Sequence, residues 1–475
     1  MLHSMVEHSM VEHSMVEHPM VEHPMVEPQT VRRIIVVGAG SAGAVVAARL
    51  SEQPDFHVTL LEAGPDHRSA ETPPEIAGSS FVAAMALPDR HWPGLQAVRS
   101  PGQAPRAYVR GRGVGGSSAI NAMVAMPGHR SDYDGWERDH GCDGWGWDDV
   151  APWFERTSLV LHRAPRSEWG RVNVALAGAE PAAIGGVDLT RSAAGARVSV
   201  NDAYLEPARG RANLVVRGDA LVDRVLLDGR VARGVRLASG EELEADLVIV
   251  SAGAIHSPAI LLRSRVDAAG IGANLHDHPS FPIAITLGES PTPTPAALPI
   301  ATVARLSSPF ETDDVQLVPI DGIDRSAPRL GLLMAALMRS KSRGSVRLAG
   351  DDPTVDPIVE FGMFTDERDW RPMSAAIDAA ERVLEHRSFA LLGAVSDYDR
   401  SHDGVRAALG DYVHAAGTCA MGTVVDPACR VIGYDGLMVC DASVMPEAPR
   451  ANLHLPTVMV AERVAAFTVD RLRDR

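Results

Sequence analysis

The sequence has few aromatic residues, few cysteines, almost no lysine and no long apolar run. Aromatic residues make up 5% of the 475, and the four cysteines form no CxxC pair. That cysteine usage excludes a disulfide-stapled scaffold and favours a reducing compartment. No apolar run approaches the roughly 18–20 residues that span a bilayer, and the N-terminus has neither the basic nor the apolar region of a signal peptide. We therefore expect no transmembrane segment and a cytoplasmic location.

Negative charge outweighs positive charge. Lysine and arginine total 45 against 61 for aspartate and glutamate, which gives a net charge of −16. This balance argues against nucleic acid or an anionic membrane as a partner and favours a small or neutral one. With 45% apolar and 22% charged residues, the chain is long enough for the cores of two or three domains.

The first thirty residues repeat a five-residue unit, Met-Val-Glu-His-Ser/Pro. A period of five matches neither the 3.6 of a helix nor the 2 of a strand, so this segment cannot present one apolar face. Its histidines could be imagined as metal ligands. A solvated, disordered tail over residues 1–30 is the simpler interpretation.

A dinucleotide-binding pattern opens the folded part. Residues 32–37 form a β-branched apolar run typical of a buried parallel strand, and Gly38, Gly40 and Gly43 follow directly. Helix-forming residues come next, which is the strand–turn–helix context that binds a pyrophosphate. A second apolar strand ends at Glu62, placed to accept hydrogen bonds from a ribose. The unit predicts a bound ADP moiety, with a purely structural glycine turn as the alternative, and does not separate FAD from NAD.

A second glycine-dense loop favours FAD. Residues 110–121 read RGRGVGGSSAIN, and this run resembles the GGSSxxN pattern of the glucose–methanol–choline (GMC) oxidoreductases, which are FAD-dependent enzymes. The resemblance covers nearly all of residues 32–468. It implies an α/β fold, with a Rossmann-like FAD-binding domain on a parallel sheet and a substrate domain built on an antiparallel sheet with helices. Further motifs of the family are matched in order by residues 251–262, 272–279, 414–422, 441–446 and 452–457.

The resemblance also implies the catalytic residues. His414, which opens the HxxGTCxMG run, would be the base for the hydroxyl proton, and His454 would be its partner, hydrogen-bonded to the developing alkoxide. A neutral imidazole suits the first role because its ordinary pKa lies near neutral pH. His256, His276 and His278 have ordinary structural explanations and stay outside the catalytic set.

The cofactor contacts carry over position by position. Some family members bind flavin covalently through a histidine in the GGSS segment, where this chain has Ile120. We therefore expect noncovalent FAD. We expect no metal site, because the cysteines lack the necessary spacing. The resemblance assigns the ADP part to Gly38, Gly40, Gly43 and Glu62, the isoalloxazine ring to Gly115, Gly116, Ser117 and Asn121, the adenine to Val222, and the ribityl–pyrophosphate chain to Asp441 and Ala442.

The same resemblance divides the chain into two interwoven domains. The FAD-binding domain would comprise residues 31–155, 195–280 and 406–475, and the substrate domain residues 156–194 and 281–405. The latter is short for the family and divergent from its better known members, so substrate specificity cannot be read across. Within it we expect strands at 302–306, 315–318 and 345–348, an amphipathic helix at 373–384, and a Pro-rich loop at 290–295.

The leading functional hypothesis is oxidation of an alcohol CH–OH group by hydride transfer to flavin N5, by a dehydrogenase rather than an oxidase. The small size and arginine-rich composition are similar to those of the actinobacterial mycofactocin-associated dehydrogenases. That similarity implies reoxidation of mycofactocinol, a reduced peptide-derived redox cofactor, with electrons passing to respiration. The partners would be a small-molecule alcohol and an electron acceptor, either a quinone, a respiratory component or oxygen. Two alternatives stay open: a flavin-containing hydroxynitrile lyase-like enzyme and a non-redox flavoprotein of the same fold.

Overall fold

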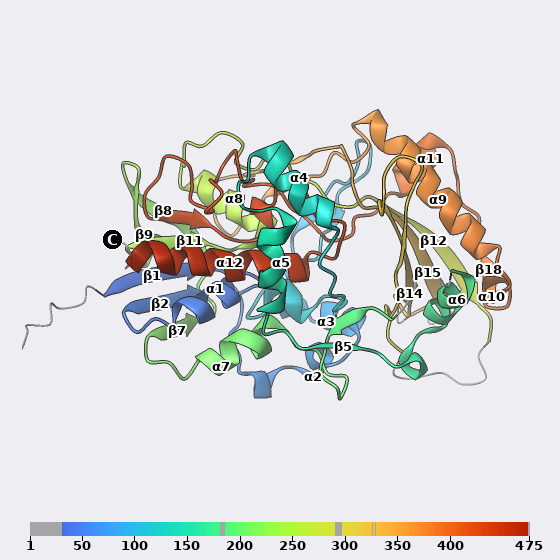
Figure 1. Ribbon diagram of the computed structural model, residues 1–475, viewed down its shortest axis with the longest axis horizontal. Coiled ribbons are helices and arrows are strands. Elements are labelled where there is room, and N and C mark those ends of the chain that lie inside the picture. The colour runs from blue at the N-terminus through green and yellow to red at the C-terminus, as the bar shows by residue number, and fades with distance from the viewer. Residues whose placement is uncertain (1–30, 181–185, 290–296, 325, 328, 474–475) are drawn as a thin grey trace, which may run out of the picture.

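The computed structural model describes residues 31–180, 186–289, 297–324, 326–327 and 329–473. Its first sheet is parallel and five-stranded, in the order β19–β11–β1–β2–β7 (Figure 1). β1 therefore lies at the centre, between a neighbour from the same end of the chain and one from its middle. The strands are β1 (Arg32–Val37), β2 (Phe56–Leu61), β7 (Leu214–Arg217), β11 (Leu247–Val250) and β19 (Leu437–Val439).

The central strands are apolar along their whole length because both of their faces are covered. Residues 34–37 and 247–250 are all buried, as is typical of a parallel sheet packed on both sides. Helix α1 packs on β1 and β2 and against α12, whereas β9 packs on β11. β9 belongs to a three-stranded antiparallel sheet, β10–β9–β8. The bounds are α1 (Gly43–Leu50), α12 (His454–Arg473), β8 (Val222–Asp228), β9 (Val231–Leu237) and β10 (Glu242–Glu244).

The other large sheet is antiparallel and lies at the opposite end of the molecule (Figure 1). Its order is β13–β14–β15–β12–β18. Helices α6 (Arg171–Ala179) and α9 (Trp370–Leu384) pack on β14 and β15, and Figure 1 shows α9 along the outer side. The strands are β12 (Ser280–Leu287), β13 (Ala304–Leu306), β14 (Val315–Asp321), β15 (Leu330–Leu337) and β18 (Gly393–Val395).

The two faces of this antiparallel sheet belong to different cores. Successive side chains of a strand point to opposite faces. Leu317 and Leu333 pack in one cluster with residues of α9, whereas Val318, Ile320 and Met334 belong to a separate cluster. Val318 and Met334 are direct cross-strand partners. One face of β14 and β15 is therefore covered by helices, and the other is turned toward the rest of the molecule.

The predicted fold class is confirmed, and several predicted elements are present with different bounds. The strand expected at 302–306 begins at Ala304, and the helix expected at 373–384 begins at Trp370. β14 continues through Pro319, although the prediction ended before it. The pairing of β14 with β13 ends at Leu317, so the proline lies where the strand has no neighbour on that side, a position that tolerates a missing N–H.

The strand expected at 345–348 exists as β16 (Ser345–Arg347), but it does not join the large antiparallel sheet. It pairs with β17 (Ile358–Glu360) in a separate two-stranded sheet. The tail over residues 1–30 and the Pro-rich loop at 290–295 lie outside the described residues. The boundaries of the two interwoven domains stay a prediction.

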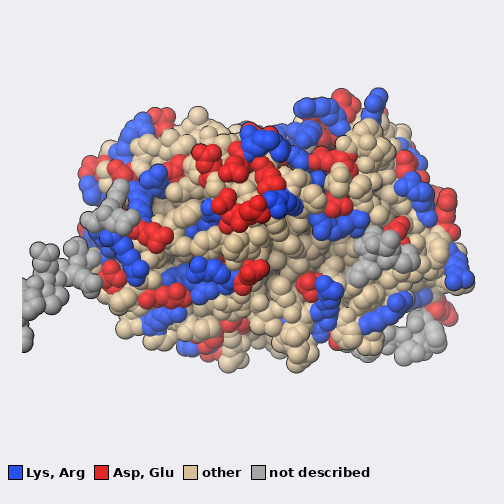
Figure 2. Space-filling view, in the orientation of Figure 1, with Lys and Arg blue, Asp and Glu red and all other residues tan. Residues whose placement is uncertain are grey.

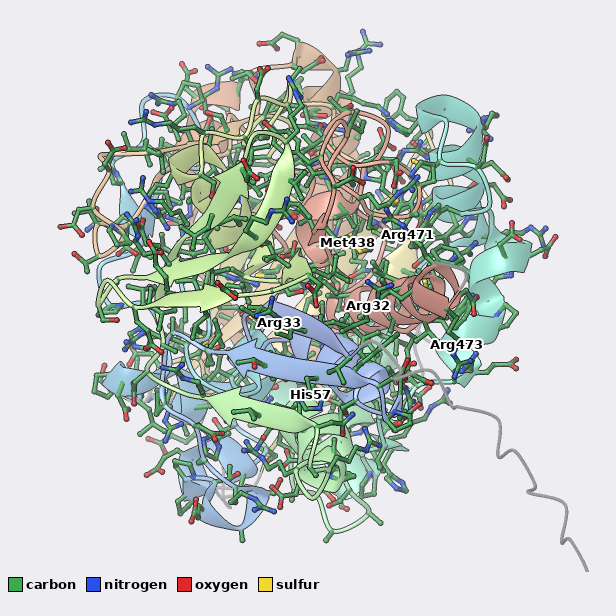
Figure 3. All side chains as sticks on the ribbon, turned by 90° about the vertical axis from the view of Figure 1, so that its left-hand side faces the viewer. Arg32, Arg33, His57, Met438, Arg471 and Arg473 are labelled. Carbon is green, nitrogen blue, oxygen red and sulfur yellow. The ribbon has the colours of Figure 1, made fainter. Side chains whose placement is uncertain are left out.

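The surface and the entry point of the chain are visible in the other views. Figure 2 shows acidic side chains gathered over α4 (Arg130–His140) and α5 (Trp147–Glu155), with both signs interspersed elsewhere on that face. Figure 3 looks at the end remote from the antiparallel sheet, where Arg32, Arg33 and His57 lie near the start of β1 and β2. The chain thus enters the fold at the end opposite to the carboxyl ends of these strands. Within the described part of the chain, no helix is both long and apolar enough to cross a membrane.

Candidate active site

A cavity of about 360 Å³ lies between the parallel and the antiparallel sheet. Its lining includes Val37 and Leu61, the last residues of β1 and β2, and Val318 and Met334 from β14 and β15. The carboxyl ends of parallel strands are the usual place for a cofactor in such folds. Eleven of the thirteen predicted site residues line this cavity: Gly38, Gly40, Glu62, Gly116, Ser117, Asn121, Val222, His414, Asp441, Ala442 and His454.

The first glycine turn leaves unfilled space on the side that faces the cavity. Gly38 has a φ of +99°, and a Cβ atom there would lie 2.5 Å from the Ser251 carbonyl oxygen. A Cβ atom on Gly43 would overlap the Gly38 carbonyl oxygen, which explains why Gly43 packs the helix to the strand and does not line the cavity. The Cβ position of Gly40 is different, because its nearest neighbour is the Gly116 Cα at 3.9 Å. Gly40 therefore keeps open a space that a ligand can occupy.

The second glycine turn packs back to back with the first. Gly115 and Gly116 have φ values of +89° and +50°, and a Cβ atom on Gly116 would lie 2.7 Å from the Gly40 Cα. The Gly115 N–H donates to the Ala39 carbonyl oxygen at 2.9 Å. Gly115 thus joins the two turns from behind and does not line the cavity.

Glu62 holds both turns through its carboxylate. Oε2 accepts the Ala39 N–H at 2.8 Å, and Oε1 accepts the N–H groups of Gly64 and Gly113 at 3.0 and 2.9 Å. A carboxylate has about four acceptor positions, so three are used within the protein. The predicted hydrogen bond to a ribose would use the remaining capacity. The sequence pattern did not reveal this bracing role, because Gly113 lies in a different motif.

Asn121 and Asp441 are also committed to the protein framework. Asn121 Oδ1 accepts from the Met123 N–H at 2.9 Å and from Arg197 Nη1 at 2.8 Å. The Asp441 carboxylate accepts from the Gly253 N–H, the Ser257 hydroxyl and the Ser443 N–H. Burial raises the pKa of Asp441, and these hydrogen bonds oppose the shift. Val222, the first residue of β8, and Ala442 complete this part of the lining.

His454 is the first residue of α12 and is buried, with 9% exposed. Its Nδ1 lies 3.0 Å from Ser41 Oγ, and its Nε2 has no hydrogen-bond partner among the described residues. Burial and the nearby Arg197 lower the pKa of His454 to about 4. The positive end of a helix dipole acts in the same direction. The imidazole is therefore neutral at pH 7.

His414 is held through its backbone. Its N–H donates to Asp277 Oδ2 at 2.8 Å, and its ring lies edge-on to His278, with centroids 5.4 Å apart, and beside Tyr412 at 4.7 Å. The ring Nδ1 is buried without a hydrogen-bond partner in the described chain. Burial, His278 and Arg110 lower the pKa of His414 well below its usual value. This imidazole is also neutral at pH 7.

Sequence reasoning missed several neighbours of the two histidines. Asp277 accepts N–H groups from His278, Tyr412 and His414, so it fixes the segment that carries the predicted base. Asp277 lies in the NLHDHP run of residues 274–279, which belongs to one of the matched family motifs, and this motif is the signal that could have identified it. Arg197, which donates a hydrogen bond to Asn121 Oδ1, lies in none of the sequence motifs and therefore could not have been identified from them.

The three histidines kept out of the catalytic set have different surroundings. His276 is satisfied by the Asn274 carbonyl oxygen at 2.6 Å and the Ala448 N–H at 2.9 Å, as expected of a structural residue. His256 stacks on Trp92, with centroids 4.0 Å apart, and lines the cavity. His278 contacts His414 but is not part of the lining.

The lining suits a large polar cofactor. Ser251 and Asn452 also line the cavity, and Ser251 Oγ and Asn452 Oδ1, like the two histidine nitrogens, are buried without a partner among the described residues. Buried polar atoms normally have partners, so these atoms and the back-to-back glycine turns fit FAD. Among the described residues, no group of three or more His, Cys, Asp or Glu side chains is arranged to hold a metal ion.

Comparison with known proteins identifies the family. Residues 32–280 and 340–461 match models described as GMC oxidoreductase. A GMC-type oxidoreductase of Rhodococcus erythropolis is 31% identical, over 91% of this chain and 97% of the relative. An oxygen-dependent choline dehydrogenase of Burkholderia ambifaria is 31% identical, over 93% of each chain. The crystal structure of pyridoxine 4-oxidase from Mesorbium loti has a TM-score of 0.82 at 27% identity, over 92% of this chain and 99% of that one. The first model alone matches more than half of the sequence, and the chain belongs to the GMC oxidoreductase family.

Proposed function

We propose that the protein is an FAD-dependent alcohol oxidoreductase in which His414 takes the hydroxyl proton and His454 stabilises the alkoxide. One observation carries the proposal: two neutral imidazoles, of which His454 is buried and His414 half-buried, line the same cavity as the two glycine turns, and each has a ring nitrogen without a hydrogen-bond partner among the described residues. Membership of the GMC family supports FAD as the cofactor. The choline dehydrogenase and the pyridoxine oxidase among its relatives support an alcohol as the substrate.

The two glycine turns would hold the cofactor without a covalent bond. Gly38 and Gly40 would face the pyrophosphate at the start of α1, where helix N–H groups favour anionic ligands. Gly116 and Ser117 would border the flavin ring. Ile120 lines the cavity at the position of the covalent link in some family members and carries no nucleophile. When bound, FAD supplies the acceptor for the carbon-bound hydride, at N5 of the isoalloxazine.

His414 would act as the general base. Its lowered pKa keeps the ring neutral at pH 7, so a nitrogen lone pair is available for the hydroxyl proton. The bond from its N–H to Asp277 holds the backbone in place while the ring charge changes. Arg110 disfavours the protonated ring, so the proton is not retained after the reaction.

His454 would stabilise the alkoxide. This role requires the tautomer in which the Ser41 hydroxyl donates to Nδ1 and the ring hydrogen is on Nε2, the atom that has no partner among the described residues. That N–H can donate to an oxygen that becomes negative as the hydride leaves. Arg197 and the N-terminus of α12 add positive potential nearby.

Finer parts of the proposal concern the acceptor and the location. We infer a dehydrogenase that reoxidises mycofactocinol and passes electrons to a quinone or a respiratory component. The arginine-rich composition and the Rhodococcus relative support this assignment. Four unpaired, buried cysteines support the cytoplasm as the location. The FAD-binding domain would comprise residues 31–155, 195–280 and 406–475, with the remainder of the folded chain forming the substrate domain.

Anaerobic stopped-flow reduction of the flavin by an alcohol tests the roles of the two histidines. His414→Ala should retain FAD and reduce it about 10²–10⁴-fold more slowly, the usual consequence of removing a general base. His454→Asn should be milder than His454→Ala, because an amide can still donate a hydrogen bond to the alkoxide. His57→Ala is the matched control, since His57 is exposed at the far end of the molecule (Figure 3).

The outcomes separate the competing functions. A wild-type reduction rate in His414→Ala would show that another group is the base. If no alcohol reduces the wild-type flavin and a cyanohydrin is cleaved, the protein is a lyase. Reduction by mycofactocinol followed by rapid reoxidation by a quinone analogue, but not by oxygen, supports the dehydrogenase assignment. Fast reoxidation by oxygen contradicts it.

A further inference from the structure

The wall of the cavity opposite the cofactor turns is built from apolar side chains. Val318 and Ile320 from β14 and Met334 from β15 line the cavity from one face of the antiparallel sheet. A sheet face turned toward water would carry polar residues at these alternate positions. The strands keep apolar residues there, so this face is suited to contact hydrocarbon.

Side chains from other segments extend the same wall. Phe81 and Met85, the first and last residues of helix α3 (Phe81–Met85), line the cavity, as do Ile300 and Val303. Phe81 and Val303 are buried in one cluster with Val318 and Ile320, and Met85, Ile300 and Met334 are packed against it. We call the six residues Phe81, Met85, Val303, Val318, Ile320 and Met334 the apolar chamber.

The carboxylates that line the cavity are all engaged by other groups. Asp411 forms an ion pair with Arg99 at 2.6 Å. Glu62 accepts three backbone N–H groups, and Asp441 accepts two N–H groups and a hydroxyl. No other Asp or Glu among the described residues lines this cavity. A cationic substrate would therefore be desolvated without a free counter-charge, which is strongly unfavourable.

The remaining polar lining also disfavours a cation. Arg110 lines the cavity near His414, and no described carboxylate forms an ion pair with it; its Nη1 donates to the Val413 carbonyl oxygen at 2.5 Å. Quaternary ammonium groups usually bind in a cage of aromatic rings, and the described lining holds three aromatic residues, Phe81, Trp92 and Tyr412. Of the three aromatic residues there, Trp92 stacks on His256, with Arg112 5.7 Å from its ring centre.

We propose that the site takes uncharged alcohols whose carbinol carbon carries a hydrocarbon body, and that it rejects cationic amino alcohols such as choline. The apolar chamber would bind the hydrocarbon while His414 and His454 contact the hydroxyl group. This inference rests on the proposed oxidation of an alcohol and adds the substrate class to it; it does not depend on mycofactocinol as the substrate. It separates the protein from its choline-oxidising relatives on the basis of its own lining residues.

A matched pair of substrates tests the inference directly. Choline and 3,3-dimethylbutan-1-ol have the same shape and differ by the charge at one atom. With the FAD-loaded wild-type protein, we expect the neutral alcohol to reduce the flavin with a kcat/KM more than about 100-fold higher, because burial of an unpaired charge is so unfavourable. Along the n-alkanols from butanol to octanol, kcat/KM should rise by up to about fourfold for each methylene group that enters the chamber.

A pair of variants locates the hydrocarbon site. Met334→Gln introduces an amide of similar size into the apolar chamber, and Met334→Leu keeps the position apolar. For octanol we expect Met334→Gln to lower kcat/KM by about tenfold or more, since an amide left without partners is costly to bury. Met334→Leu should lower it by less than about threefold. FAD content reports whether each variant is folded, and butanol reports whether the reaction itself is intact.

Perturbation of the flavin spectrum by each ligand separates the two proposals. Preferential binding or oxidation of choline over its neutral isostere overturns the substrate class and leaves the proposed function standing. A flat alkanol series, or equal octanol rates in the two Met334 variants, also overturns it. If the neutral alcohols bind and no alcohol, charged or neutral, reduces the flavin, the proposed function itself is wrong.

Discussion

Replacing Asp277 by asparagine should impair catalysis by His414, the proposed general base, although His414 itself is unchanged. The Asp277 carboxylate accepts N–H groups from His278 and Tyr412 at Oδ1, at 2.6 and 3.3 Å, and from His414 at Oδ2, at 2.8 Å. Asparagine keeps one acceptor oxygen and places an NH₂ group at the other position. At least one of these N–H groups therefore loses its partner and faces a donor.

The size of the effect follows from this geometry. A buried N–H group left without its partner costs about 1–3 kcal/mol, so the loss of one of these bonds should lower the free energy of unfolding by about that amount. The freed segment carries His414, and a displacement of about 1 Å at an active site costs on the order of 10²-fold in rate. We expect Asp277→Asn to retain FAD and to slow its reduction by a saturating alcohol by about 10–100-fold.

Asp321→Asn is the matched control. Asp321 is also buried, and its carboxylate accepts the N–H groups of Val172 and Asn173. It lies on the face of β14 away from the cavity, because it alternates with Ile320. Both variants should lose similar stability to urea, but only Asp277→Asn should slow flavin reduction in stopped flow. Equal reduction rates in the two variants would refute the positioning role of Asp277.

Three further predictions concern the cofactor, the tail and acid stability. The Gly40→Val variant should fold but lose FAD, because the valine side chain would point into open space in the cavity and occupy the pyrophosphate position. A yellow variant that releases FAD on acid precipitation would contradict this. Deletion of residues 1–30 should leave flavin content and turnover unchanged, since the described chain begins at the far end of the molecule (Figure 3); loss of either property would reveal a role for the tail. Burial lowers the pKa of His276 to about 3 and those of His278 and His454 to about 4, whereas an unfolded histidine titrates near about 6.5. Below that pKa these histidines bind more protons in the unfolded state than in the folded state, so the stability that they contribute is present above it and is lost as the pH falls toward 4. The midpoint of urea denaturation should therefore drop between pH 7 and pH 5. An unchanged midpoint would count against buried neutral histidines.

Local patterns predicted the strand–turn–helix–strand unit beside the cavity. Gly38, Gly40 and Glu62 belong to one strand–turn–helix–strand unit, and such a unit is specified by residues close together in the sequence. The positions of His414 and His454 followed from motifs of a known family. The bond between Asp277 and the His414 N–H was not predicted, because it joins segments 137 residues apart.

The polarity of the substrate side could not be predicted either. β14 is buried on both faces, so its sequence VQLVPID shows no alternation that would reveal which residues line a cavity. Only the packing of α6 and α9 on one face shows that Val318 and Ile320 are turned to the other. Tertiary packing, rather than the pattern of the strand, decides which residues would meet a substrate.

The order of strands in the parallel sheet has a consequence for synthesis of the chain. β1 is among the first parts to be made, yet its partner β11 follows about 210 residues later, and β19 completes the sheet about 400 residues later. Synthesis proceeds at about 5–20 residues per second, so the apolar edge of β1 stays unpaired for on the order of 10–40 s until β11 has been made. The free edge of β11 then stays unpaired for a similar time until β19 has been made. Helix α12, which covers α1, is made last of all. The nascent protein must therefore be shielded from aggregation until translation is almost finished, and the FAD cradle cannot close before its final helix emerges.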